Sequence, residues 1–153
     1  MRDLMDLTDQ INQHQYLYLT AIGELETNVL QVVIQEAKVS SDTETIEVGA
    51  AKIMDVHPIV SDESSCAYEI TFRSYIAYAV LNESFASVDE YEEYSGRFFR
   101  VYSKSHFLDY IRAATFASDD YPGKSTHYEI ACLDHIVDVI SVDEPEIRAL
   151  SRA

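Results

Sequence analysis

The sequence predicts a single α+β domain over residues 1–153, with an N-terminal helix, an antiparallel sheet of about five strands and a second helix before the last strand. Hydrophobic residues recur at three- and four-residue steps near the N-terminus and again after residue 105, which is typical of helices, and they alternate between these regions, as in strands. The composition, 47% hydrophobic and 11% aromatic, is that of a chain that buries a core.

The first element is a helix predicted over residues 3–23. Gly23 is expected to end it, because glycine tolerates the positive φ found at helix C-termini. The residues of the predicted apolar stripe are Leu4, Leu7, Ile11, His14, Tyr18, Ile22 and Leu25.

Three strands are predicted next, because the hydrophobic period changes to two after Asn28. The first carries Leu30, Val32 and Ile34 on one face, and the second runs from Ile46 to Val56. The third covers residues 68–80, where an apolar face alternates with a mixed one. This pattern is typical of an antiparallel sheet that is covered on one side.

A short helix is predicted from Ser87, because Ser87 and Glu90 have the spacing of a capping box and Gly96 follows. A strand over residues 97–102 and a helix over residues 105–117 come next.

The last predicted strand covers residues 127–142, which fit a helix and a strand equally well by spacing. Enrichment in β-branched residues favours the strand. Asp143, Glu144 and Pro145 end it, and the tail from about residue 143 is predicted to be mobile.

The net charge of −16, from 27 acidic and 11 basic residues, limits the partners. Nucleic acids and anionic membranes are disfavoured, because both are bound largely through Lys and Arg. A cationic partner, such as a basic protein, is permitted. The N-terminus has no signal-peptide pattern and no segment approaches the roughly 20 apolar residues of a membrane span, so we predict a cytoplasmic location.

The acidic segment 89–94 is the first candidate contact surface. Carboxylates steer cationic partners, and tyrosine is enriched in binding hot spots. Our first hypothesis is therefore a non-catalytic inhibitor or immunity-type module that presents this segment to a basic protein. In the alternative interpretation the tyrosines face the core and the acids form a solvated face. The candidate residues are Asp89, Glu90, Tyr91, Glu92, Glu93 and Tyr94.

A group of basic residues is the second candidate, for a small anion near the N-terminus of the helix at 105–117. It supports a second hypothesis, a small-molecule binder or enzyme that uses the mixed face of the sheet. The alternative is that these bases pair with neighbouring acids. A structural homo-oligomer is the third hypothesis. The candidate anion-binding residues are Arg73, Arg97, Arg100, Lys104 and His106.

No motif predicts a catalytic residue, a cofactor or a metal site. The densest group of potential ligands is His127, Glu129, Cys132, Asp134, His135 and Asp138. On one continuous strand, His127 and His135 would stand about 26 Å apart, too far to share an ion. Cys66 and Cys132 lie in strand-like segments and are predicted to be buried thiols, not a disulfide.

Overall fold

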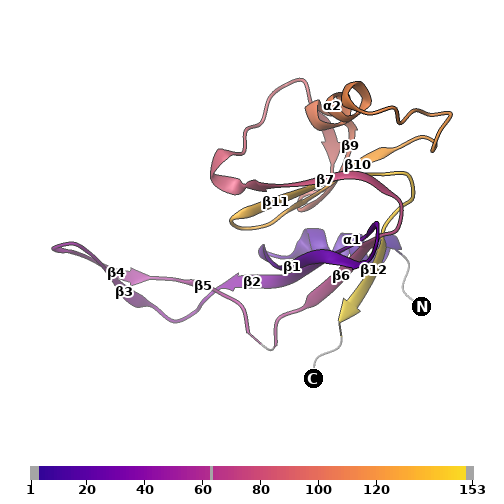
Figure 1. The fold of residues 1–153 in the computed structure, drawn as a ribbon. Coiled ribbons are helices and arrows are strands. Elements are labelled where there is room, and N and C mark those ends of the chain that lie inside the picture. Colours follow the sequence, from indigo (N-terminus) through magenta and orange to yellow (C-terminus); the bar gives the residue numbers. More distant parts are fainter. Residues whose placement is uncertain (1–3, 63, 151–153) are drawn as a thin grey trace.

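Two antiparallel sheets stack face to face in a computed structural model of the chain, which describes residues 4–62 and 64–150 (Figure 1). The first sheet has the order β1-β2-β6-β12, with β5 paired to β2, and the second has the order β7-β11-β10-β9-β8. The first-sheet strands are β1 (Tyr16–Glu26), β2 (Val29–Val39), β5 (Ile59–Val60), β6 (Ala67–Phe72) and β12 (Glu146–Leu150). The second-sheet strands are β7 (Tyr75–Asn82), β8 (Glu93–Ser95), β9 (Phe99–Lys104), β10 (Thr126–Ala131) and β11 (His135–Ser141).

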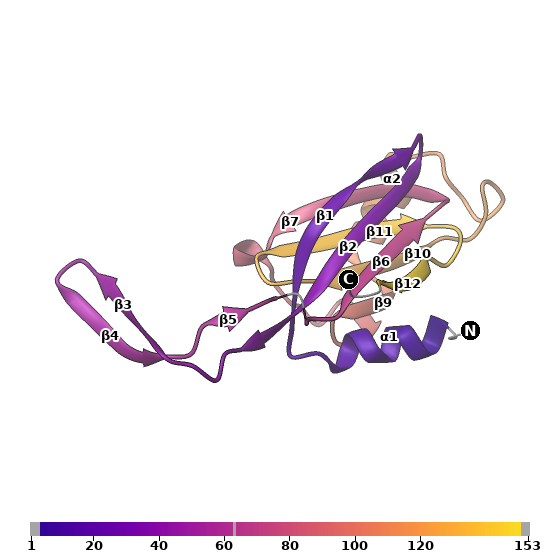
Figure 2. The same cartoon turned by 90° about the horizontal axis from the view of Figure 1, so that it is seen from below.

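The core lies between the two sheets. Ile70 and Phe72 of β6 meet Ile130 of β10 and Val137 of β11, and all four side chains are fully buried. Helix α1 (Leu4–Gln13) lies beside the sheets (Figure 2) and adds Leu7 and Ile11 to the core. Burying a side chain of this size contributes roughly 1.5–3 kcal/mol. The predicted α+β class with antiparallel strands is therefore confirmed, although two stacked sheets and a separate hairpin replace the single sheet of about five strands.

The helix predicted over residues 3–23 is wrong after Gln13, and residue 3 itself lies outside the described residues. Strand β1 begins at Tyr16 and pairs with β2 as far as Glu26, so Gly23 lies within a strand. The pairing satisfies backbone groups along both strands and buries Leu17. Tertiary pairing thus overrides the local helical spacing.

The side chain of Asn12 holds the C-terminal end of α1 to the start of β9. Its Oδ1 accepts hydrogen bonds from the backbone N–H groups of Arg97, Phe98 and Phe99, at 3.1, 2.8 and 2.8 Å. Arg97 and Phe98 precede β9, and Phe99 is its first residue. One amide oxygen therefore accepts hydrogen bonds from three consecutive backbone N–H groups and joins two segments that are far apart in the sequence.

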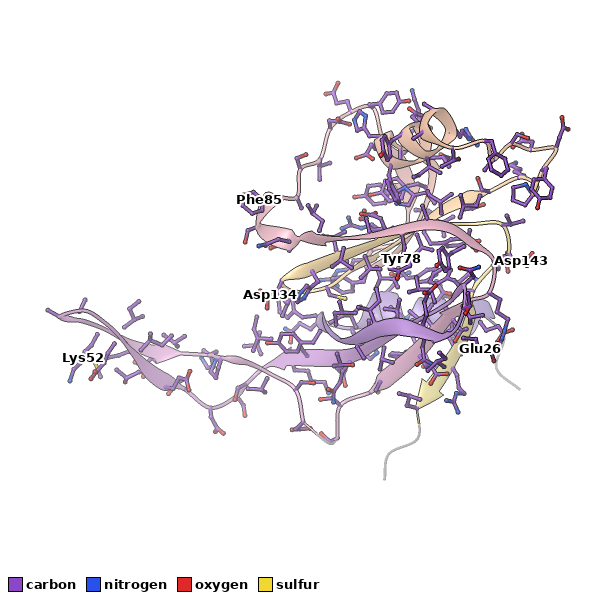
Figure 3. All side chains as sticks on the ribbon, in the orientation of Figure 1. Glu26, Lys52, Tyr78, Phe85, Asp134 and Asp143 are labelled. Carbon is purple, nitrogen blue, oxygen red and sulfur yellow. The ribbon has the colours of Figure 1, made fainter. Side chains whose placement is uncertain are left out.

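The strand predicted from Ile46 to Val56 is instead a hairpin. Strands β3 (Glu44–Val48) and β4 (Ala51–Val56) pair with each other only, and Gly49 takes a positive φ of 62° in the turn between them. The hairpin projects away from the stacked sheets (Figures 1 and 2), with Lys52 near its far end (Figure 3).

The predicted strand over residues 68–80 is also divided. Strand β6 belongs to the first sheet and β7 to the second, and the chain crosses between them at Arg73 and Ser74. The backbone N–H of Val142 donates to the Ser74 carbonyl at 3.1 Å, which holds this crossing against the end of β11. The alternation of apolar residues over residues 68–80 therefore runs through two strands, β6 and β7, which lie on opposite sides of the same core.

The predicted helix from Ser87 is wrong, because residues 86–92 form no helix and lead into β8. In place of a capping box, the Asp89 side chain accepts a hydrogen bond from the Tyr91 N–H at 3.0 Å. Such local bonds to the backbone compete with helix formation. Within the tail from about residue 143, residues 146–150 form β12, paired with β6, where Ile147 packs against the core. Residues 151–153 lie outside the described part of the chain, and the mobility of the tail stays a prediction.

The strand interpretation of residues 127–142 is confirmed, but the chain reverses within the segment to form β10 and β11. The later helix is confirmed as α2 (His106–Ala114), with Ser105 as its N-cap, and the preceding strand as β9. No helix within residues 4–62 and 64–150 combines the length and apolar character needed to cross a membrane.

Candidate functional site

Strand register places a group of polar side chains on the outer face of the second sheet. Glu129 of β10 lies directly opposite Arg100 of β9 on one side and Asp138 of β11 on the other. In the adjoining row, His127 lies opposite Tyr102. Directly opposed residues share a face of a sheet, so these five side chains form one group, the polar cluster.

A cavity of about 230 Å³, the outer pocket, lies over the polar cluster. The cluster forms part of its floor, and α2 contributes His106 and Phe107 to its wall. The segment 85–88 covers it from the far side, beginning at Phe85, which Figure 3 labels above the sheet. The remaining lining residues are Leu81, Glu92, Tyr94 and Ile136.

His127 is held on every side. Its Nδ1 lies 2.7 Å from Ser105 Oγ and its Nε2 lies 2.7 Å from Asp138 Oδ1. Its ring stacks on Tyr102, with centroids 4.4 Å apart, and the Phe107 ring meets it nearly edge on. The residue is 2% exposed, and burial lowers its pKa from 6.5 to about 4. The imidazole is therefore neutral at pH 7.

The Asp138 carboxylate can only accept a hydrogen bond, so the proton of the neutral His127 ring lies on Nε2, and Nδ1 accepts from Ser105. Ser105 Oγ accepts the N–H of Leu108 at 3.1 Å as the N-cap of α2, and its own O–H donates to His127 Nδ1. Serine, histidine and aspartate are thus linked in series, but the hydroxyl is fully buried and serves as a cap, so it positions His127 and does not act as a nucleophile.

Glu129 and Asp138 form a buried pair of carboxyl groups. Burial, followed by a hydrogen bond to Asp138, raises the pKa of Glu129 from 4.5 to about 7. Burial also raises the pKa of Asp138. Arg100 Nη1 and the Tyr102 hydroxyl donate to Glu129 Oε1 at 2.9 and 3.0 Å. One guanidinium faces two carboxyl groups, so the pair retains a proton that can be given up or taken near neutral pH.

The acidic segment 89–94 meets the start of α2 at the mouth of the outer pocket, where Glu92, Tyr94 and His106 contribute to the lining. His106 Nε2 lies 2.6 Å from Asp89 Oδ2, and the hydrogen bond raises the pKa of His106 and lowers that of Asp89. The Tyr91 ring stacks on His106, and its hydroxyl donates to Asp109. Lys104 Nζ lies 4.4 Å from the centre of the same ring. These contacts fasten the segment to α2.

Of the predicted partner-binding residues, Glu92 and Tyr94 line the outer pocket. Asp89, Glu90, Glu93 and Tyr94 are exposed, and Tyr91 and Glu92 are half-buried. Asp89 and Tyr91 are engaged by α2, as described above. Contact of this segment with a basic protein stays a prediction.

The predicted anion-binding residues are only partly brought together. Arg100 and His106 both line the outer pocket. Arg73 pairs with Glu146 at 3.0 Å near β12, Arg97 lies over the Phe98 ring, and Lys104 lies over Tyr91 at the mouth.

His127, Glu129 and Asp138 of the polar cluster belong to the group of potential ligands that the sequence analysis judged too far apart to share an ion. The assumption of one continuous strand was wrong, because the chain turns between Cys132 and His135 and brings Asp138 opposite Glu129. Ligand atoms of His127, Glu129 and Asp138 lie within 4.8 Å of one another, as do those of two other groups, His14 with Glu36 and Cys66, and Asp89 with Glu92 and His106.

A second cavity, of about 380 Å³, adjoins the outer pocket at the end where β10 and β11 are joined. The two cavities share Ala86, Val88, Arg100 and Ile136. The second cavity, the apolar extension, is lined mainly by hydrophobic side chains and by Glu83. The hydrophobic set is Leu17, Phe98, Ala131, Cys132 and Leu133, with Tyr16 beside it. No disulfide joins the two cysteines of the described residues; Cys132 is buried and Cys66 is half-buried, so the prediction of two buried thiols holds for Cys132.

Comparison of the chain with protein-family models, with curated proteins and with solved structures finds no match.

Proposed function

We propose that this protein binds a small molecule in the outer pocket. The observation that carries the proposal is the polar cluster itself: five ionisable side chains, all with shifted pKa values, converge at the floor of a concave pocket with partly apolar walls. Perturbed ionisable groups in a cleft are typical of binding and active sites. Two of the candidate bases, Arg100 and His106, line this pocket, which favours the second hypothesis.

A cost in stability supports the same proposal. Like charges directly opposite each other on a sheet are unfavourable, and burying carboxyl groups is unfavourable as well. A purely structural sheet face at Glu129 and Asp138 would be more stable with apolar residues. Retention of a buried acidic pair beneath a cavity is therefore better explained by a ligand than by folding.

Protein-observed NMR with mixtures of small cationic, anionic and neutral compounds tests the proposal. We expect shifts that cluster at the backbone amides of residues 85–107 and 127–138. Ala86 lines both cavities, so replacing it with tryptophan should narrow both and abolish these shifts. Ala113→Trp, on an exposed position of α2, is the matched control. Shifts scattered over the surface, or unaffected by Ala86→Trp, would contradict the proposal.

Binding of a basic protein by residues 89–94 is a second candidate function, favoured by the exposure of Glu90 and Glu93 beside the pocket mouth. Replacing Asp89, Glu90, Glu92 and Glu93 with amides should slow association with such a partner and flatten its salt dependence. A pull-down at low salt with the wild type and with the amide variant tests this function. If both capture the same proteins, the acidic segment does not bind a basic partner. Self-association is tested by size exclusion with light scattering.

A further inference from the structure

The charges around the two joined cavities are unbalanced toward the negative. The carboxyl groups of Glu92, Glu129 and Asp138 line the outer pocket, and Glu83 lines the apolar extension. Arg100 is the one Arg or Lys among the residues that line the two cavities as described. Glu92 lines the same pocket as the polar cluster, and its Oε2 accepts the backbone N–H of His106 at 3.3 Å.

Arg100 is already occupied by protein groups. Its Nε donates to the Arg97 carbonyl at 2.9 Å and its Nη1 to Glu129 at 2.9 Å, while the guanidinium lies over the Tyr94 ring at 4.8 Å. An anion at this position would compete with Glu129 for the guanidinium and would leave that buried carboxyl group with the Tyr102 hydroxyl and Asp138 but without a positively charged partner. Such a loss costs more than the new contact supplies.

A cation has the opposite effect. It would take the place of the proton that Glu129 and Asp138 hold between them, and each carboxyl group would then have a positive partner.

The positive charge is better carried by a small organic group than by a metal ion. A divalent ion held by His127, Glu129 and Asp138 would lie beside the Arg100 guanidinium, which is 2.9 Å from Glu129. It would also have to break the hydrogen bonds from His127 to Asp138 and from Arg100 to Glu129. A singly charged ammonium repels Arg100 less and donates hydrogen bonds to carboxylate oxygens.

We propose that the ligand is a protonated amine with an apolar substituent, whose ammonium group lies between Glu92, Glu129 and Asp138 and whose substituent follows the apolar extension past Ile136. This inference rests on the proposed small-molecule function and names the chemical class of its ligand. The lining residues that the two cavities share support an apolar substituent on the ligand. The excess of carboxyl groups among the lining residues supports its positive charge.

Isothermal titration calorimetry with three six-carbon compounds of different charge tests the class of ligand. At pH 8, hexylamine is a cation, hexanoate an anion and hexan-1-ol neutral. We expect hexylamine to bind at least tenfold more tightly than hexan-1-ol, and hexanoate to give no measurable binding. Each methylene removed from the amine should weaken binding about fourfold.

Asp138→Asn should weaken hexylamine binding at least tenfold and leave hexan-1-ol unchanged. Asp119→Asn, an exposed acid that lines neither cavity, is the matched control and should change binding less than twofold. If Asp138→Asn does not fold, Glu92→Gln at the pocket wall serves in its place. An equal loss in the Asp119 variant would assign binding to the overall charge and overturn the inference.

The remaining outcomes separate this inference from the proposed function. If hexanoate or hexan-1-ol binds as tightly as hexylamine and Ala86→Trp abolishes it, the pocket binds small molecules but the amine class is wrong. Competition between hexylamine and Zn²⁺ or Mg²⁺, with the metal bound more tightly, would also overturn it. If no compound of the three binds, the amine class falls, and the NMR screen alone decides the proposed function.

Discussion

Replacing Glu129 with glutamine should make the protein more stable at high pH and leave it nearly unchanged at low pH. Glutamine keeps the shape of the side chain: its carbonyl oxygen can accept from Arg100 and Tyr102, and its amide can donate to Asp138, as the protonated Glu129 does. The substitution therefore removes the ionisation of Glu129 and little else.

The magnitude follows from the pKa of Glu129, which is about 7 in the folded protein against an ordinary value of 4.5. Because the folded state holds the proton more tightly, the stabilisation is complete below pH 4.5 and is lost as the pH rises through 7. Between pH 5 and pH 8 the wild type should lose about 2–3 kcal/mol of unfolding free energy from this group. Glutamine does not titrate, so the variant should gain that amount relative to wild type over the same interval.

The contribution of His127 to stability depends on pH in the opposite direction, which masks the effect of Glu129 in the wild type. Its pKa falls from 6.5 to about 4 on folding, so its contribution is complete above pH 6.5 and is lost as the pH falls through 4. Over pH 5 to 8 the two residues nearly offset each other, at about 2–3 kcal/mol each. The wild type should accordingly show a weak dependence from this pair, and Glu129→Gln should show stability rising with pH.

Urea denaturation followed by far-ultraviolet circular dichroism at pH 5, 6, 7 and 8 measures both proteins. Glu93→Gln, at an exposed position in β8, is the control and should differ from wild type by a constant small amount. If the difference between Glu129→Gln and wild type is also constant across these pH values, Glu129 titrates normally and the shared proton is refuted.

Three further substitutions test the supports of the site. Asn12→Ala should cost about 1–3 kcal/mol in urea denaturation, because it leaves three backbone N–H groups without an acceptor, and Asn12→Asp should recover most of this. Gly96→Ala should lower the melting temperature by several degrees, because φ is 96° and the added Cβ would lie 2.1 Å from the Phe99 carbonyl oxygen. Gly23→Ala is the control, because a Cβ at that position meets no atom within 4 Å. Equal melting temperatures of the two variants would contradict the close approach at Gly96. Ser105→Ala should cost about 1–2 kcal/mol and reduce the protection of the Leu108 amide in hydrogen exchange, and unchanged exchange would remove its role as a cap.

Elements with a strong local signal could be predicted from the sequence. Ser105 before an apolar stripe predicts α2, and the alternation of Leu30, Val32 and Ile34 predicts β2, because capping and strand burial depend on neighbouring residues. The N-terminal error arose where spacing was ambiguous: Tyr18 and Ile22 lie on a helical stripe but belong to β1, and only the pairing with β2 decides between the two.

The site could not be predicted, because it depends on which residues of separate strands lie opposite each other. Glu129 meets Asp138 only because the chain turns at Leu133 and Asp134, and this turn contains neither glycine nor proline. Asp134 itself adopts a φ of 65°, a conformation that aspartate tolerates and that leaves no clear mark in a sequence. A one-residue change in the position of that turn would put Asp138 on the core face.

The projecting β3-β4 hairpin has a consequence for how the protein can be engineered. Its two ends are held together where the Ser40 N–H donates to the Pro58 carbonyl at 2.7 Å, and β5 continues that pairing beside β2. None of the described side chains of residues 44–56 belongs to the buried core. The hairpin is therefore an exchangeable insertion: a short turn, a peptide tag or another small domain could be joined between Ser40 and Pro58 while the chain on either side folds as before.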